Sequence, residues 1–219
     1  MDKVVYKDTP GYYLENKHSK NGIVLIQEWW GVDDNLKDYA KAYSDQFKVI
    51  VPDLYRNRVT QDKDEAKHLM DGMDFNNATM DILNLAHYLR QQGCEKVAVV
   101  GYCMGGALSI CSAVKNDGSI DAGVCYYGIP PKQYFDYTTI KIPMQFHFGK
   151  HDTQKGFSDK DSYLKLKSDI QQANIDTNDF YEYDANHAFM NKHEPAFPYN
   201  KEAATLATQR TLAFLGKLF

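Results

Sequence analysis

Short runs of consecutive apolar residues alternate along this chain with longer amphipathic segments, and this alternation limits the possible folds more than any other feature. Unbroken apolar runs are typical of strands that are covered on both faces of a sheet. They predict strands at residues 23–26, 49–51, 97–100, 122–127, 144–148 and 179–183. Apolar residues at helical spacing predict helices at residues 36–46, 62–73, 78–92, 106–115, 158–173 and 201–218. Strand and helix in strict alternation predict an α/β fold with a mostly parallel, doubly wound sheet flanked by helices.

The rest of the sequence is that of an ordinary globular protein. No linker or repeat divides the 219 residues, so we expect one domain over residues 1–219. Lys and Arg number 25 against 29 Asp and Glu, and the charges alternate in sign, so we expect no nucleic-acid partner. Glycines interrupt the uncharged residues 97–114, which favours strand, turn and helix over a membrane span. The start of the chain has no apolar leader and the four cysteines have no paired spacing, which indicates a cytoplasmic protein without a zinc site.

One helix carries a recognisable start signal. Ser158 and Asp161 have the spacing of a capping-box-like pair, so we expect the helix predicted at residues 158–173 to begin there.

Residues 101–106, Gly-Tyr-Cys-Met-Gly-Gly, follow the predicted strand at 97–100. Ligands bind just beyond the carboxyl ends of strands in such sheets. A dinucleotide-binding turn would need glycine at position 103, where this chain has cysteine. A nucleophile elbow instead needs a nucleophile with glycine two residues before and after it, which fits Cys103. The N–H of Met104 would then open a helix and donate to an oxyanion. The alternative is that Cys103 is a small buried apolar side chain.

A nucleophile of this kind is followed in the chain by an acid and then by a histidine. Asp152 comes just after the predicted strand at 144–148, and His187 follows the one at 179–183. We therefore expect Asp152 to orient His187, and His187 to act as the base. The alternatives are that Asp152 only forms a turn, and that His151 or His193 is the base. No histidine or cysteine spacing suggests a metal site, and we expect no metal and no cofactor.

The first predicted buried strand is followed by Glu28, Trp29 and Trp30. A carboxylate at this strand end would point into the same crevice as Cys103, whereas the alternative is a solvated loop residue. The two tryptophans would form walls of an apolar pocket that excludes water.

Together these motifs resemble the dienelactone hydrolase family. The matching segments are Gln27-Glu28 with Gly31, residues 52–55, residues 101–106, residues 126–128 and residues 186–189. The resemblance runs from about residue 22 to the C-terminus and implies an α/β-hydrolase fold. It implies a Cys103–His187–Asp152 triad, with Glu28 hydrogen-bonding the resting thiol. It also implies that the backbone N–H groups of Trp29 and Met104 hold the oxyanion.

The chain departs from the family where the substrate carboxylate is held. The family uses two arginines there, and the nearest matches in this sequence are Lys63 and Asn191. Lysine is a point charge and asparagine has no charge, so bidentate capture of a carboxylate is not expected. We expect substrate contacts from four residues, namely Trp30, Lys63, Tyr102 and Asn191.

The sequence therefore predicts a cysteine-dependent hydrolase of small-molecule esters or lactones, similar to carboxymethylenebutenolidase, that works through an acyl-thioester. One alternative is a non-catalytic small-molecule binding protein on the same fold. Another is a peptidase or acyltransferase that uses the same triad.

Overall fold

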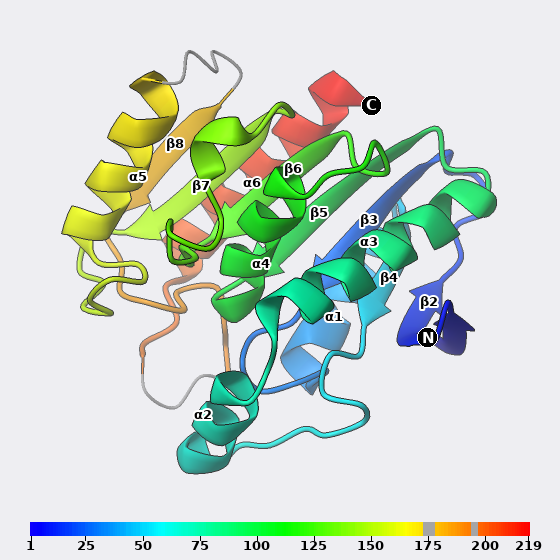
Figure 1. The fold of residues 1–219 in the computed structure, drawn as a ribbon, viewed down its shortest axis with the longest axis horizontal. Coiled ribbons are helices and arrows are strands. Elements are labelled where there is room, and N and C mark those ends of the chain that lie inside the picture. The colour runs from blue at the N-terminus through cyan, green and yellow to red at the C-terminus, as the bar shows by residue number, and fades with distance from the viewer. Residues whose placement is uncertain (173–177, 194–196) are drawn as a thin grey trace.

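The computed structural model describes residues 1–172, 178–193 and 197–219. Its centre is a mixed sheet of eight strands in the order β1-β2-β4-β3-β5-β6-β7-β8 (Figure 1). The strands are β1 (Asp2–Tyr6), β2 (Thr9–Leu14), β3 (Asn21–Ile26), β4 (Lys48–Pro52), β5 (Lys96–Tyr102), β6 (Ala122–Tyr126), β7 (Met144–Gly149) and β8 (Asp179–Tyr183). The helices are α1 (Asp34–Ser44), α2 (Lys63–Asp71), α3 (Phe75–Gln91), α4 (Met104–Val114), α5 (Lys160–Gln172) and α6 (Lys201–Leu218), with a 3-10 turn η1 (Tyr137–Thr139).

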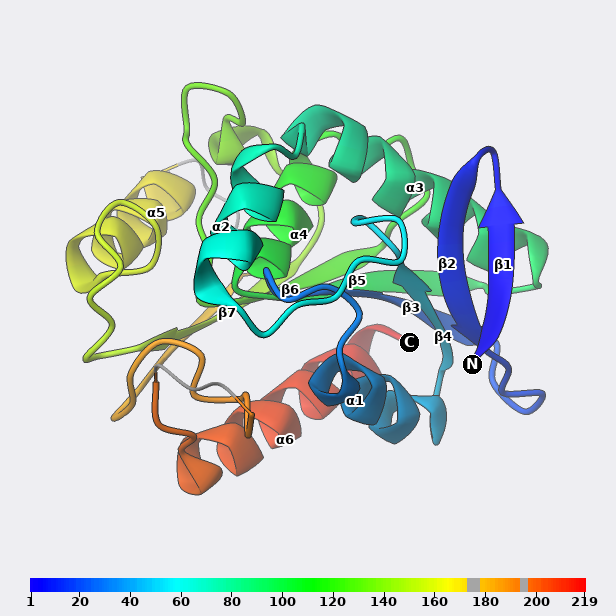
Figure 2. The same ribbon diagram turned by 90° about the horizontal axis from the view of Figure 1, so that it is seen from below.

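The strands from β3 to β8 run parallel to one another, which confirms the predicted sheet. Helices α1 and α6 lie on one face of this sheet, and α2, α3, α4 and α5 lie on the other (Figure 2). Both faces of the central strands are therefore covered, and residues 23–26 of β3 are completely buried. This double burial is the reason that the strands have unbroken apolar sequences.

The first two strands were not predicted from the sequence. β1 and β2 form an antiparallel hairpin in which Asp2 pairs with Tyr13, and β2 in turn pairs antiparallel with β4. The hairpin turn places Lys7 at φ 47° and Asp8 at φ 62°. Turns of this kind usually carry Asn-Gly or Asp-Gly, because glycine and asparagine tolerate positive φ. Lys-Asp lacks that signal, and burial in β2 alternates along the strand.

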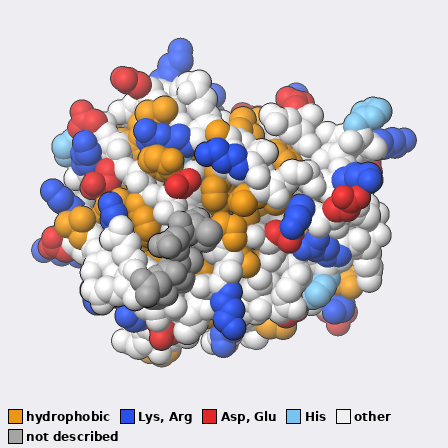
Figure 3. Space-filling model, turned by 90° about the horizontal axis from the view of Figure 1, so that it is seen from above, with side chains coloured by type: hydrophobic (Ala, Val, Ile, Leu, Met, Phe, Trp, Pro, Cys, Tyr) orange, Lys and Arg blue, Asp and Glu red, His pale blue; other side chains and the backbone are white. Residues whose placement is uncertain are grey.

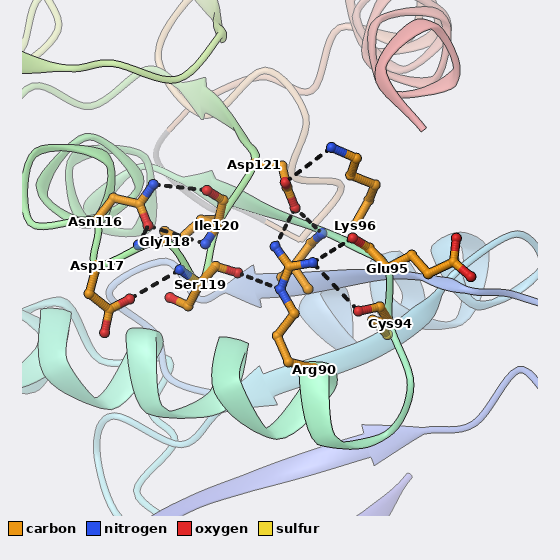
Figure 4. A network of polar contacts seen from close by, with 11 residues as sticks. Arg90, Cys94, Glu95, Lys96, Asn116, Asp117, Gly118, Ser119, Ile120 and Asp121 are labelled. Atoms are coloured by element: carbon orange, nitrogen blue, oxygen red, sulfur yellow. Dashed lines mark hydrogen bonds and ion pairs between the residues drawn. The ribbon is translucent and has the colours of Figure 1, made fainter.

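A cluster of polar contacts ties α3 to the amino ends of β5 and β6 (Figure 4). Cys103 follows the opposite, carboxyl end of β5. The Arg90 guanidinium donates to Asp121 Oδ2 at 2.5 Å, to the Ser119 carbonyl at 3.1 Å and to the Glu95 carbonyl at 2.5 Å. Asp121 Oδ2 also accepts the backbone N–H of Val97 at 2.8 Å. Since hydrogen bonds to charged groups are the stronger ones, this cluster fixes the helix against the sheet.

Basic and acidic side chains lie interspersed on the face shown in Figure 3, as their near balance in the sequence predicts. Residues 97–114 form β5, a sharp turn and α4, which confirms the strand–turn–helix interpretation. In the described part of the chain, no helix has both the length and the apolar content that crossing a membrane requires.

Candidate active site

Cys103 occupies a sharp turn between β5, which ends at Tyr102, and α4, which begins at Met104. Its backbone has φ 53° and ψ −117°, a conformation that costs a non-glycine residue strain energy. Glycine at the flanking positions makes the turn possible. A Cβ at Gly101 would lie 1.9 Å from the carbonyl oxygen of Gly105, and a Cβ at Gly105 would lie 2.5 Å from that of Ile26. The geometry is that of a nucleophile elbow.

The structure brings the predicted acid and base to Cys103. His187 Nε2 lies 3.2 Å from Cys103 Sγ, and His187 Nδ1 lies 2.7 Å from Asp152 Oδ2. All three residues are buried, although Cys103 and His187 still line a cavity. Asp152 follows β7 and uses its Oδ1 to accept the backbone N–H of Gln154 at 2.9 Å. We assign the Nδ1 proton of His187 to the bond with Asp152, which leaves Nε2 as the acceptor that faces the sulfur.

Ser158 lies at the same imidazole, and the sequence prediction for it was wrong. The helix α5 begins at Lys160, so Ser158 does not start it. Ser158 is completely buried, and its hydroxyl oxygen lies 3.0 Å from His187 Nδ1. His187 Nδ1 therefore has two oxygen neighbours, Ser158 Oγ and Asp152 Oδ2. Sequence offered no sign of this contact, because a Ser-x-x-Asp pair is also a common helix start.

Glu28 follows β3 and is buried in the wall of the cavity, next to Cys103. Its Oε1 accepts the hydroxyl of Tyr127 at 3.2 Å, and its Oε2 accepts the side-chain amide of Asn191. Burial and, to a smaller extent, the nearby Glu28 carboxylate hold the pKa of Tyr127 well above its usual value. Tyr127 therefore stays protonated and donates to Glu28. Asn191 donates to Glu28 and is absent from the described lining of the cavity.

The cavity beside Cys103, called here the site cavity, has a volume of about 440 Å³. Its described lining consists of Glu28, Trp29, Lys63, Met70, Cys103, Gln154, Phe157, His187, Ala188 and Phe197. Of the predicted substrate contacts, only Lys63 belongs to this lining. Trp30 is buried and packs against Trp29, with the two ring centroids 4.8 Å apart.

The structure contradicts the predicted substrate contact at Tyr102. This side chain is 1% exposed and belongs to the core on the α1 side of the sheet. Its ring stacks on Tyr126 at 4.6 Å, and its hydroxyl lies 3.3 Å from that of Tyr43. Tyr102 is the last residue of β5, and its side chain packs on one face of the sheet against Tyr126 of the neighbouring strand β6. Only the next residue, Cys103, turns toward the cavity.

The backbone N–H groups predicted to hold the oxyanion belong to Met104, next to Cys103 in the chain, and to Trp29. Met104 is the first residue of α4, where backbone N–H groups have no acceptor within the helix. Trp29 follows Glu28 directly and lines the site cavity. The positive end of the α4 dipole also points to Cys103, which favours a thiolate there.

The other three cysteines are buried elsewhere, and burial raises their thiol pKa values. It raises the pKa of Cys94 to about 11 and that of Cys125 to about 12, and it also raises the pKa of Cys111. The alternative base His151 lies at the surface, where its Nε2 pairs with Asp184 Oδ1 at 2.6 Å. His193 is also exposed. Among the residues that the structure describes, no group of three or more His, Cys, Asp or Glu could hold a metal ion.

Comparison with known proteins gives consistent matches over most of the chain. The sequence model of the dienelactone hydrolase family matches residues 9–219. A carboxymethylenebutenolidase from Pseudomonas putida is 30% identical over 209 residues, which cover 90% of this chain and 85% of that protein. Protein usf from Aquifex pyrophilus is 29% identical over 195 residues, covering 83% of this chain and 82% of that protein.

Solved structures show the same fold. The crystal structure of a dienelactone hydrolase-like promiscuous phosphotriesterase from metagenomic libraries superposes with a TM-score of 0.84 at 19% identity. The superposition covers 100% of this chain and 98% of that one. A thermophilic esterase from Thermogutta terrifontis superposes with a TM-score of 0.67 at 13% identity, covering 97% of this chain and 93% of the other.

Proposed function

Because this chain belongs to the dienelactone hydrolase family, we propose that it hydrolyses esters or lactones with Cys103 as the nucleophile. The observation that carries the proposal is the continuous contact from sulfur to carboxylate. Cys103 Sγ lies 3.2 Å from His187 Nε2, and His187 Nδ1 lies 2.7 Å from Asp152. A nucleophile, a base and an orienting acid in this geometry are the requirements of covalent acyl transfer.

The first half of the reaction forms a thioester. Asp152 holds the Nδ1 proton of His187, so Nε2 accepts the proton of the Cys103 thiol. The thiolate attacks the carbonyl carbon of the substrate, and the carbonyl electrons move onto its oxygen. The N–H groups of Trp29 and Met104 donate to that oxyanion. The carbon–oxygen bond then breaks, and His187 returns the proton to the leaving alkoxide or enolate, which in a lactone stays attached to the acyl group.

The second half of the reaction releases the acid. His187 Nε2 takes a proton from water, and the resulting hydroxide attacks the thioester carbonyl. The same two N–H groups stabilise the oxyanion, because the charge develops at the same place. The carbon–sulfur bond breaks, the acid leaves, and Cys103 recovers its proton.

Glu28 shares the thiol proton in the resting enzyme. Its carboxylate is buried beside Cys103 and is held there by Tyr127 and Asn191. These two donors fix its position and compensate its charge inside the protein, where an isolated carboxylate would be costly.

The substrate of this reaction is a neutral ester or lactone. Among the described residues of the site cavity, Lys63 alone carries a permanent positive charge. Asn191 is already bonded to Glu28, so it does not hold a substrate carboxylate. A lone, exposed lysine provides no bidentate grip on a carboxylate.

The test compares Cys103→Ala with Cys94→Ala, using p-nitrophenyl acetate and a neutral lactone as substrates. Cys103→Ala is expected to lose roughly 10³-fold or more of kcat, whereas Cys94→Ala keeps it. Circular dichroism checks that both variants fold. Unchanged turnover in Cys103→Ala would refute the nucleophile. If the wild type binds esters and hydrolyses none of them, the chain is a binding protein.

A further inference from the structure

A second cavity adjoins the site cavity, with a volume of about 490 Å³. We call it the apolar cavity. Met70 and Phe157 line both cavities, so the two cavities are neighbours at these residues. The ring centroid of Phe157 lies 6.1 Å from that of His187. Phe157, which lines the apolar cavity, therefore also lies close to the candidate base.

Most of the residues that line the apolar cavity come from segments that carry none of the candidate catalytic residues. Met73 and Phe75 come from the α2–α3 connection and the start of α3, while Ile129, Tyr134 and Phe135 come from the segment after β6. Tyr134 belongs to this lining and is 69% exposed. An exposed aromatic beside a cavity has the character of a ligand contact.

The charges of the two cavities differ. The site cavity holds both Lys63 and Glu28, whereas Asp71 is the single charged side chain among the described residues that line the apolar cavity. The Asp71 carboxylate is already paired with the Lys67 ammonium, and the described lining contains no cationic side chain that could pair with an anionic group. The apolar cavity therefore fits an uncharged hydrocarbon or aromatic group.

The boundary between the cavities can adapt to such a group. Met70 and Phe157 are both half-buried. Methionine is unbranched and flexible, so Met70 can adjust to a chain that passes from one cavity to the other. Each cavity alone falls within the range of about 300–1,000 Å³ that is usual for small-molecule sites.

We propose that the apolar cavity is a second substrate subsite, which binds an extended, uncharged apolar arm of the ester while the carbonyl sits at Cys103. This inference rests on the proposed function and names its substrate class: esters with a chain of several carbons on the acyl or the alcohol side. A small lactone alone leaves the apolar cavity empty. The shared lining residues Met70 and Phe157 place this cavity beside the site cavity, which favours this occupant over a protein partner.

The experiment measures kcat/KM along two series. One is p-nitrophenyl esters from acetate to decanoate, and the other is alkyl acetates from ethyl to decyl. On the side that enters the apolar cavity, kcat/KM rises roughly two- to fourfold for each methylene that becomes buried. The series that rises shows which side of the ester enters. A maximum at the shortest ester in both series would overturn the proposal.

A matched pair of variants locates the effect. Asn76 and Asn77 are both exposed in the first turn of α3, and both backbone N–H groups are capped by Asp74. Asn76 lines the apolar cavity, and Asn77 is absent from its described lining. Asn76→Trp fills the cavity and lowers the ratio of long-chain to short-chain kcat/KM about tenfold, whereas Asn77→Trp keeps the ratio within twofold. Equal ratios in the two variants would contradict the subsite.

A binding measurement separates this inference from the proposed function. N-phenyl-1-naphthylamine is a neutral apolar dye whose fluorescence rises on binding, and it needs no turnover. Asn76→Trp weakens its Kd at least fivefold, and Asn77→Trp does not. If this difference appears while no ester is hydrolysed, the cavity stands and the proposed function fails. If esters are hydrolysed and the two variants bind the dye equally, the subsite is wrong and the proposed function stands.

Discussion

Replacing Asp152 by asparagine keeps the shape of the side chain and removes its charge. In the native structure Asp152 Oδ1 accepts the backbone N–H of Gln154 at 2.9 Å, and Oδ2 faces His187 Nδ1 at 2.7 Å. The asparagine keeps the Gln154 bond with its oxygen, so its NH₂ group turns to His187. Nδ1 must then accept a hydrogen bond. The ring proton moves to Nε2, which faces the sulfur of Cys103.

This wrong tautomer of His187 determines how much kcat falls in Asp152→Asn. A neutral His187 with its proton on Nε2 has no free lone pair for the thiol proton, and the imidazolium loses its neighbouring carboxylate. The same exchange in a Ser-His-Asp enzyme lowers kcat by about 10⁴. A thiol is more acidic than a serine hydroxyl and depends less on the base, so we expect a smaller loss here, roughly 10²–10³ in kcat, or about 3–4 kcal/mol.

The assay is steady-state hydrolysis of p-nitrophenyl acetate, and the matched control is Asp184→Asn. Asp184 pairs with His151 at 2.6 Å in the same way, but both side chains are more than half exposed. The control should change kcat by less than twofold, since exposed pairs contribute little. If Asp152→Asn keeps more than a third of the wild-type kcat, the orienting role assigned to Asp152 is wrong.

Three further predictions follow from other groups. Iodoacetamide should label Cys103 before the other cysteines, because burial raises the thiol pKa of Cys94, Cys111 and Cys125. Mass spectrometry measures the labelling, and equal labelling of all four cysteines would contradict an activated thiol at Cys103. Ser158→Ala should lower kcat about two- to tenfold with KM unchanged, because His187 Nδ1 loses one of its two oxygen neighbours. Unchanged kinetics would show that the Ser158 hydroxyl does not position the imidazole ring. Burial, and to a smaller extent Arg210, hold the pKa of His147 well below 6.5. In acid, the imidazole of the unfolded chain therefore binds a proton that the folded protein does not bind. The free energy of unfolding should therefore fall below pH 6.5, by at most about 1.4 kcal/mol per pH unit from this group, and urea titrations should show a flatter dependence in His147→Gln.

The central strands and the helices that cover them can be predicted from the sequence, because a strand that is buried on both faces has apolar side chains at consecutive positions. Residues 97–100 of β5 are completely buried, and all four are apolar. The ends of elements depend on single side chains. α1, for example, begins at Asp34, two residues before the predicted start, because Asp33 caps it through the backbone N–H of Leu36. The β1–β2 hairpin was missed because its edge position leaves an alternating pattern and its turn lacks glycine.

The candidate site follows from the sequence only where its geometry is local. The sharp turn at Cys103 needs glycine on both sides, and that requirement is visible within six residues. The surroundings of the site depend on tertiary contacts across long stretches of chain. Ser158 reaches His187 over 29 residues, Tyr127 reaches Glu28 over 99, and Asn191 reaches Glu28 over 163. No local sequence pattern predicts contacts between residues so far apart in the chain.

The sequence also did not predict which side chain at the end of β5 lines the site cavity. Tyr102 and Cys103 are neighbours, yet one packs in the core against Tyr126 and the other lines the site cavity. Neighbouring side chains along a strand point to opposite faces, and Cys103 lies just beyond the strand with a positive φ. An adjacent position in sequence therefore did not mean an adjacent position in the site.

Trapping the covalent intermediate tests the central proposal most directly. The wild-type protein is mixed with excess p-nitrophenyl ester, quenched in acid within milliseconds and digested, and the mass of each cysteine peptide is measured. We expect the acyl mass on the peptide that contains Cys103, and expect it to disappear in Cys103→Ser or to move to the serine. Rapid ester hydrolysis with an acyl group on a different residue, or with the Cys103→Ala variant still turning over at the wild-type rate, would contradict a thioester mechanism.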